Sequence, residues 1–125
     1  MADKKILLVD DDADLRLLLE SALRLLKYEF ESVDGGFAAI EKASQKKFAL
    51  IIMDWHMPDL DGFEVSRKIW TESRFNRDTK IIAFTSSDTP EEVAQCRDHG
   101  FADVLSKSFE MRRLEEMLAK YVPGE

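Results

Sequence analysis

Three acidic side chains stand at the ends of two apolar runs, and this placement is the chain's strongest chemical signal. Ile6–Val9 leads directly into Asp10 and Asp11, and the run 50–53 leads directly into Asp54. Such aliphatic runs are typical of strands buried on both faces, and therefore of parallel strands. Ligands of an open α/β sheet bind just beyond the carboxyl ends of its strands. The three carboxylates are therefore predicted to share one crevice.

Bringing these carboxylates together costs electrostatic free energy. Two like charges 4 Å apart repel by about 4 kcal/mol at an effective dielectric constant of 20. A divalent cation removes this repulsion, and Mg²⁺ binds a few carboxylates together with waters and substrate oxygens. The sequence therefore predicts a divalent metal site at Asp10, Asp11 and Asp54.

Strand and helix patterns alternate five times along the 125 residues. This alternation, with short connections, predicts a doubly wound α/β fold in which helices cover both faces of a five-stranded parallel sheet. One domain is expected over residues 1–125, with its core at about 4–121 and no output domain. The expected strands are 5–9, 29–33, 48–53, 80–85 and 103–105, and the expected helices are 13–26, 37–46, 63–72, 90–99 and 109–121.

The first predicted helix follows the acidic run and borders the crevice. Asp12 is placed to cap it. Leu17 falls on the outer face, where we expect it to help dock a phosphodonor protein. The apolar face predicted to pack on the sheet consists of Leu15, Leu18, Leu19, Ala22 and Leu26.

Composition excludes several classes of protein. No apolar run approaches the roughly 20 residues of a membrane helix, and Met1–Lys5 has no signal-peptide core. The net charge of −7 argues against direct nucleic-acid binding, which needs a basic face. Cys96 is the only cysteine, so it forms no internal disulfide. It is expected to be a small core residue in a cytoplasmic protein.

Two further strand ends carry reactive side chains, a hydroxyl at Thr85 and an ammonium group at Lys107. With these, the chain resembles the receiver domain of two-component response regulators over essentially its whole length. The resemblance is specific because four sequence segments occur in the same order as in the family and at the corresponding strand ends. They are Val9-Asp10-Asp11, then Met53-Asp54-Trp55-His56-Met57-Pro58 with Leu60-Asp61-Gly62, then Ile81-Ile82-Ala83-Phe84-Thr85, and Lys107 before Phe109.

The resemblance implies a flavodoxin-like sheet of order 2-1-3-4-5. It implies that Asp54 accepts a phosphoryl group from a phosphohistidine on a sensor histidine kinase or a histidine phosphotransfer protein. Thr85 and Lys107 would each bind a phosphoryl oxygen. Such a chain is a signalling module that catalyses its own phosphorylation and dephosphorylation, not an enzyme acting on a separate substrate.

The resemblance also implies how the metal, Mg²⁺ or Mn²⁺, is held. Asp11 would be a direct ligand, and Asp10 would act mainly through a metal-bound water. Asp54 and the backbone carbonyl of His56 would complete the protein ligands.

The chain departs from the family at two positions. Ser108 stands where the family usually has a proline after the lysine, often joined by a cis bond. A cis bond before serine would cost about 2.5–4 kcal/mol, so the loop is expected to be either trans and differently shaped, or strained. Val104 replaces the usual aromatic switch residue. An aromatic switch coupled to Thr85 therefore cannot operate there, and output is predicted to use loop positions or another face.

Three alternative functions compete with a phosphoacceptor. A haloacid-dehalogenase-type phosphohydrolase would use Asp10 as nucleophile, but the run Asp10–Asp14 has Asp where that motif needs Thr or Val. A calcium-binding loop starting at Asp10 fails, because its sixth residue is Leu15 instead of Gly and its twelfth is Ser21 instead of Glu. A pseudo-receiver that binds partners without phosphorylation is disfavoured by the intact acids, threonine and lysine. The sequence is compatible with a free-standing regulator, a phosphorelay shuttle or a receiver domain of a longer protein.

Overall fold

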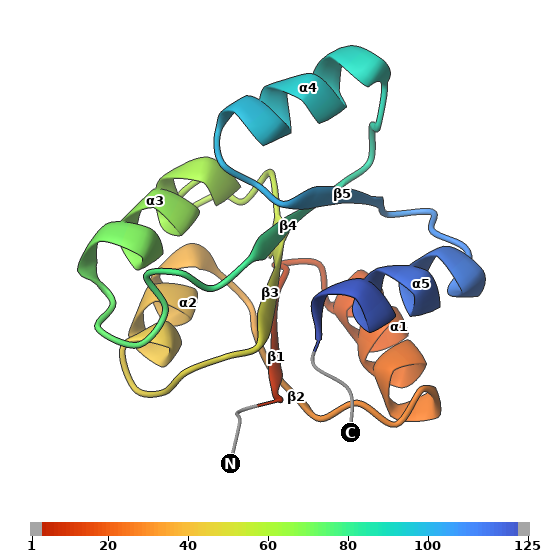
Figure 1. Ribbon diagram of the computed structural model, residues 1–125, viewed down its shortest axis with the longest axis horizontal. Coiled ribbons are helices and arrows are strands. Elements are labelled where there is room, and N and C mark those ends of the chain that lie inside the picture. The colour runs from red at the N-terminus through yellow and green to blue at the C-terminus, as the bar shows by residue number, and fades with distance from the viewer. Residues whose placement is uncertain (1–3, 123–125) are drawn as a thin grey trace.

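The computed structural model describes residues 4–122, and in it strands and helices alternate as predicted (Figure 1). All ten predicted elements are present, and Pro123-Gly124, predicted to end the last helix, lies outside the described residues. The strands are β1 (Ile6–Val9), β2 (Phe30–Val33), β3 (Leu50–Asp54), β4 (Ile81–Thr85) and β5 (Asp103–Ser106). The helices are α1 (Ala13–Leu25), α2 (Gly36–Ala43), α3 (Gly62–Glu72), α4 (Pro90–Asp98) and α5 (Met111–Tyr121).

The five strands form one parallel sheet in the order β2-β1-β3-β4-β5, which confirms the predicted doubly wound arrangement. β1 and β3 are neighbours, and their register pairs Val9 with Met53. The residues that follow, Asp10 and Asp54, therefore emerge side by side at the carboxyl edge. The strand order reverses here, and the connections after β1 and β3 leave toward opposite faces, which opens a crevice between them.

Helices cover both faces of the sheet, as Figure 1 shows: α1 and α5 lie on one side, and α2 and α3 on the other, with α4 beyond them. Successive residues of β1 alternate between these layers. Ile6 and Leu8 pack with α1 and α5, whereas Leu7 and Val9 pack with α2 and α3. Because both faces are covered, every residue of β1 is apolar and buried.

The predicted apolar face of α1 was wrong at two positions. Leu18 was expected in the core but is 54% exposed, whereas Leu23, which was not expected there, is fully buried. The buried residues are Leu19, Ala22 and Leu23. At 100° per residue, Leu18 lies about 90° from the centre of this face, so it sits at the edge of the buried face.

The segment between α3 and β4 is a loop, as predicted, but three of its polar side chains, Ser73, Asn76 and Thr79, are buried. Asn76 accepts a hydrogen bond from Phe48 N at 2.9 Å and donates to the carbonyls of Ala43 at 2.7 Å and Lys46 at 2.8 Å. Ser73 Oγ donates to the same Ala43 carbonyl at 2.8 Å. These bonds satisfy buried backbone groups and tie the α2–β3 connection to the α3–β4 connection.

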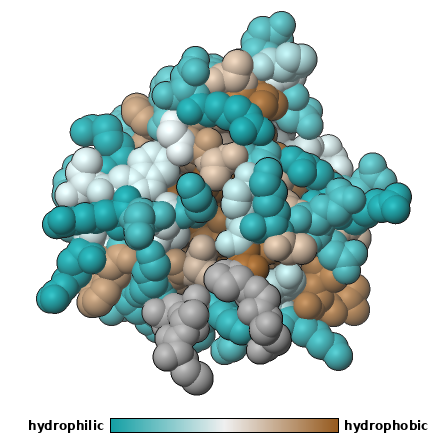
Figure 2. Space-filling view, in the orientation of Figure 1, coloured by the Kyte–Doolittle hydropathy of each residue, from teal (hydrophilic) through white to brown (hydrophobic). Residues whose placement is uncertain are grey.

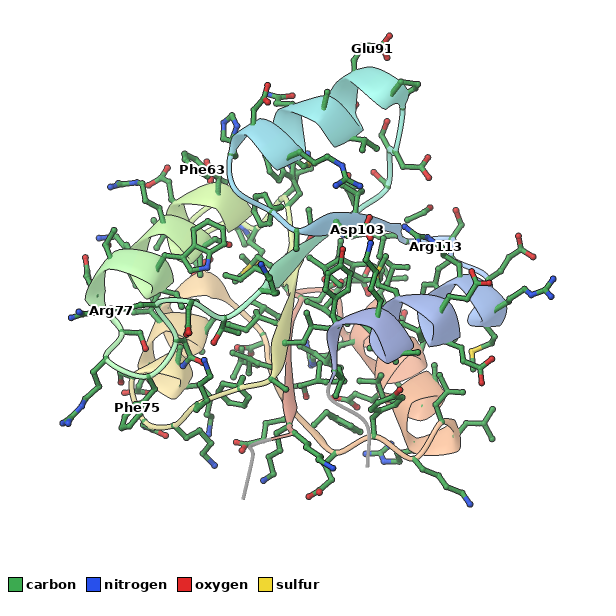
Figure 3. All side chains as sticks on the ribbon, in the orientation of Figure 1. Phe63, Phe75, Arg77, Glu91, Asp103 and Arg113 are labelled. Carbon is green, nitrogen blue, oxygen red and sulfur yellow. The ribbon has the colours of Figure 1, made fainter. Side chains whose placement is uncertain are left out.

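An ionic cluster ties β5 to the helices on either side of it. Asp103 begins β5 and is buried, and its carboxylate lies 3.2 Å from the Arg113 guanidinium of α5 and 3.5 Å from that of Arg97 of α4. Figure 3 shows Asp103 and Arg113 lying close together. Tyr121 donates its hydroxyl to the same carboxylate at 3.1 Å.

The helix ends follow local chemistry. Asp12 caps α1 through bonds to two backbone N–H groups, and Thr89 caps α4 with Pro90 in its first turn. α4 ends at His99, whose ring contacts the Gln95 carbonyl, and Gly100 follows with φ of 100°. Within residues 4–122, no helix is both long and apolar enough to cross a bilayer.

Candidate functional site

The carboxyl edge of the sheet brings the three predicted acids together. One carboxylate oxygen from each of Asp10, Asp11 and Asp54 lies within 4.8 Å of the others. Asp10 and Asp54 are buried, whereas Asp11 is exposed at the mouth of the crevice. The crevice therefore combines two desolvated carboxylates with one that solvent reaches.

Lys107 enters the same crevice from the loop after β5. Its ammonium nitrogen lies 2.9 Å from Asp54 Oδ1 and 4.0 Å from Asp10 Oδ2. The nitrogen also sits 5.7 Å from the ring centroid of Phe84, within cation–π range. One lysine thus offsets part of the negative charge of the acids, and the site keeps a net negative charge.

Two buried carboxylate oxygens in the crevice could accept hydrogen bonds or bind a metal ion. Asp10 Oδ2 and Asp54 Oδ2 are buried, and neither has a hydrogen-bond partner among the described residues. A buried polar atom without a partner is costly, and more so when it is charged. Hard divalent cations take oxygen ligands of this kind, so the donor set fits such an ion.

The environment changes the pKa values of both partners in the central ion pair. Burial raises the pKa of Asp54 from 3.8 to about 7; the hydrogen bond from Lys107 opposes this, and the Asp10 carboxylate adds to it. Burial alone would lower the pKa of Lys107, but the carboxylates of Asp54, Asp10 and Asp11 outweigh burial and raise it. Lys107 therefore stays charged near neutral pH, while Asp54 is poised to titrate there.

Backbone contacts hold the acids in place. Asp10 Oδ1 accepts a bond from Asp12 N at 2.9 Å, and Asp54 Oδ1 accepts one from His56 N at 3.2 Å. The Arg16 guanidinium donates to the Asp10 carbonyl at 2.8 Å. Sequence patterns did not reveal this role for Arg16, because the contact depends on how α1 folds back over the end of β1.

Gly62 sets how closely α3 approaches the strand that carries Asp54. A Cβ atom added to Gly62 would lie 2.4 Å from the Asp54 carbonyl oxygen, well inside contact distance. Gly62 N donates to the Trp55 carbonyl at 2.9 Å, which closes the loop that carries His56. Asp61 caps α3 through a bond from Glu64 N.

Thr85 lies at the end of β4 on the same edge and is buried. Its hydroxyl oxygen accepts a bond from Ser87 N at 3.2 Å, and its carbonyl accepts one from Lys107 N at 2.8 Å. Beside it lies a cavity of about 230 Å³. The cavity is lined by Trp55, His56, Thr85, Glu92, Gln95 and Cys96.

The structure shows how the chain is arranged at Ser108 and Val104, the two positions where it departs from the family. The Lys107–Ser108 peptide is trans, like every other peptide bond of the described residues, which is one of the two alternatives left open by the sequence. Ser108 N donates to Ser106 Oγ at 3.1 Å. Val104 is buried in the core layer beneath α4, with Cys96 and Phe101. Cys96 is a buried free thiol and core residue, as predicted.

A five-stranded 2-1-3-4-5 sheet with an acidic crevice and a lysine at its carboxyl edge defines a phosphoacceptor class of signalling domain. The chain belongs to the response regulator receiver domain family, whose model matches residues 6–119. It is therefore a receiver domain of two-component signalling, a signalling module, which decides against the phosphohydrolase alternative.

Known relatives agree with this membership. The receiver protein CpdR of Brucella abortus is 32% identical over 94% of this chain and 95% of its own length. The chemotaxis protein CheY4 of Vibrio cholerae superposes with a TM-score of 0.86 at 30% identity, covering 97% of this chain and all of that one. The receiver domain of the sensor histidine kinase PA1611 of Pseudomonas aeruginosa, solved with magnesium in its active-site cleft, has a TM-score of 0.84 at 30% identity, covering 96% and 98%.

Several other curated relatives are much longer than this chain. It spans between 7% and 25% of their length, and they include histidine kinases and a response regulator. Segments similar to this chain thus occur both within histidine kinases and within a response regulator.

Proposed function

We propose that Asp54 accepts a phosphoryl group from a phosphohistidine of a sensor histidine kinase or a histidine phosphotransfer protein. The observation that carries this proposal is the state of the Asp54 carboxylate: Oδ1 is paired with Lys107 at 2.9 Å, while the buried Oδ2 has no hydrogen-bond partner within residues 4–122. Oδ2 attacks phosphorus, the P–N bond of the donor breaks, and the donor imidazole leaves with the bonding electron pair. An acyl phosphate remains on Asp54.

Lys107 and Thr85 act on the transferred group. Lys107 exchanges its bond to Asp54 for a bond to a phosphoryl oxygen, and it neutralises charge on the equatorial oxygens during in-line transfer. The Thr85 hydroxyl, which now accepts from Ser87 N, is free to donate its proton to another phosphoryl oxygen. Charge-assisted bonds of this kind contribute about 1.5–3 kcal/mol each, enough to shift a loop equilibrium.

The proposed cofactor is Mg²⁺ or Mn²⁺. Asp11 would bind it directly, Asp10 mainly through a water, and Asp54 with the backbone carbonyl of His56 would complete the protein ligands. The clustered oxygens, the two buried oxygens without hydrogen-bond partners, and the magnesium in the PA1611 receiver support this assignment. When bound, the cation masks the negative charge that would otherwise repel nucleophile from phosphoryl group.

The acceptor assignment has a direct test. The chain is incubated with Mg²⁺ and acetyl phosphate, and mass spectrometry follows the addition of one phosphoryl group. We expect addition at Asp54 that EDTA and Asp54→Asn both abolish. Labelling of Asp10 instead of Asp54, or labelling that survives Asp54→Asn, would refute the assignment.

We further propose that the chain catalyses its own phosphorylation from small donors and its own dephosphorylation, and that it acts in the cytoplasm. Kinases that make phosphohistidine draw on cytoplasmic ATP, and the free thiol of Cys96 is stable in that reducing compartment. We expect the domain to act as one unit over residues 1–125, because a single sheet and its helices account for the described fold.

The phosphodonor is proposed to dock on α1 near the crevice. Leu17 is 56% exposed there, and Figure 2 shows an apolar patch at the lower right, over α1. Leu25, 73% exposed, lies roughly 12 Å further along the helix and away from the crevice. Leu17→Asp should retain phosphorylation by acetyl phosphate and lose transfer from the kinase, whereas Leu25→Asp should retain both. Kinase transfer that survives Leu17→Asp would exclude this docking site.

A further inference from the structure

The amino end of α2 is capped by a side chain from a distant loop. Its N-cap residue, Gly35, has no side chain to satisfy the first free N–H groups of the helix. The Asp59 carboxylate fills that role, accepting bonds from Gly36 N at 3.2 Å and from Phe37 N at 3.1 Å. A carboxylate at this end also interacts favourably with the helix dipole. Asp59 belongs to the β3–α3 loop, so the cap joins two elements more than 20 residues apart.

The two glycines allow this close approach. A Cβ atom added to Gly36 would lie 2.6 Å from Val65 Cγ2 and 3.2 Å from Leu60 Cβ. One added to Gly35 would lie 3.2 Å from Asp59 Oδ2. Any other residue at position 36 would push α2 away from the loop. The contact is thus built from both sides, with an acid on the loop and glycines on the helix.

The loop held by this cap carries His56, which belongs to the candidate site. At its base, Gly62 N donates to the Trp55 carbonyl at 2.9 Å. At its tip, Asp59 is bonded to α2 and also accepts from Leu60 N at 2.8 Å. His56 lies between these two anchors, and its N–H donates to Asp54 Oδ1 at 3.2 Å. With both ends of the loop fixed, the peptide planes of His56 have little freedom to turn.

We propose that Asp59 is a positioning residue, whose cap on α2 holds the β3–α3 loop so that the His56 backbone faces Asp54 and the metal. The inference rests on the proposed metal site and adds a residue that does not touch the metal. Because linkage is reciprocal, metal binding at the crevice must in turn strengthen the cap. The crevice is thereby coupled to the first turn of α2, where Phe37 is 64% exposed.

Two measurements on the full chain test this inference, with Mg²⁺ as the probe. The first is the Mg²⁺ dissociation constant, followed by the fluorescence of Trp55, which adjoins Asp54. We expect Asp59→Ala to weaken Mg²⁺ binding by about fivefold or more, within the usual range of coupling between sites. Asp59→Asn keeps an acceptor oxygen and should restore most of the affinity. Thr89→Ala removes the cap of α4 and serves as the matched control, with unchanged Mg²⁺ affinity.

The second measurement is amide hydrogen exchange at Gly36 and Phe37, which a purely structural cap would not link to the metal. In the wild-type chain, saturating Mg²⁺ should slow exchange of both amides by about fivefold or more, the coupling expected between the two sites. It needs no variant, so it stands even if Asp59→Ala fails to fold. If the exchange rates of Gly36 and Phe37 do not change with Mg²⁺, or if Asp59→Ala binds Mg²⁺ with wild-type affinity, the role of Asp59 is refuted. The proposed metal site is unaffected by either result. Absence of Mg²⁺ binding by the wild-type chain would instead overturn the proposed site itself.

Discussion

Replacing Asp54 by asparagine should make the metal-free protein more stable, although it removes the acceptor. The Asp54 side chain is fully buried with one oxygen unpaired, and its pKa is raised from 3.8 to about 7. Between these two pH values the folded protein holds a proton that the unfolded chain has released. Stability therefore falls as the pH rises through this window, and the full penalty applies above pH 7.

The size of the effect follows from the pKa shift. Each pKa unit corresponds to about 1.4 kcal/mol, so a carboxylate shifted this far destabilises the folded state by at most about 4 kcal/mol. Asparagine keeps the shape without the charge, and the loss of the Lys107 pairing is already contained in this upper limit, because Lys107 opposes the rise in the Asp54 pKa. We therefore expect a net gain of about 2–4 kcal/mol, or roughly 10 °C in melting temperature for a domain of this size.

Urea unfolding followed by circular dichroism in EDTA, from pH 5 to pH 8, measures this gain. Asp54→Asn should exceed the wild type most at pH 8, and the difference should fall by more than half by pH 5, because it disappears only near the unfolded pKa of 3.8. Asp88→Asn, a matched change at an exposed carboxylate, should stay within about 0.5 kcal/mol of wild type throughout. If Asp54→Asn is no more stable than wild type at pH 8, the buried carboxylate is not under electrostatic strain and the reasoning fails.

Three further outcomes are expected. Lys107→Ala should slow phosphorylation by acetyl phosphate about 10- to 100-fold with an unchanged circular dichroism spectrum, since it removes a charge-assisted bond; an unchanged rate would place the lysine outside the reaction. Glu31, whose pKa is lowered to about 2 mainly by the Lys46 ammonium, contributes stability above pH 4.5 that is lost as the pH falls toward 2. Glu31→Gln should thus lower the unfolding free energy in urea by about 1–2 kcal/mol at pH 7, a value that already allows for solvent screening of the ion pairs. Near pH 2 the substitution should have no effect. Asn76→Ala should lower the unfolding free energy by about 2–4 kcal/mol, because Phe48 N and the Lys46 carbonyl lose their partners, while the Ala43 carbonyl keeps Ser73; a loss below 0.5 kcal/mol would show that water replaces the amide.

Short-range patterns predicted the framework well, because they depend on neighbours in the chain. Buried parallel strands need continuous apolar runs, so Ile6–Val9 and Leu50–Asp54 could be located within two residues. The cap of α4 at Thr89 follows from a few adjacent residues in the same way. Where a prediction depended on the exact rotation of a helix it failed, and Leu18 lies exposed at the rim of α1.

Contacts between distant segments could not be predicted from short-range sequence patterns. No sequence pattern indicated that Asp59 caps α2 from more than 20 residues away. The Arg16 bond to the Asp10 carbonyl and the buried Asn76 network likewise depend on which loops the packing brings together. Polar residues in such positions look like ordinary loop residues until their partners are known.

By itself, the sequence determined the fold class and the identity of the acids, hydroxyl and lysine at the strand ends. These follow from hydrophobic periodicity and from the rule that parallel strands present their carboxyl ends at one edge. Only the tertiary structure decided that Lys107 pairs with Asp54 and that α2 is tied to the His56 loop. It also decided that one oxygen each of Asp10 and Asp54 has no hydrogen-bond partner among the described residues. Distances and desolvation are properties of packed elements, and they turn a set of suitable residues into a charged crevice with a raised pKa at Asp54.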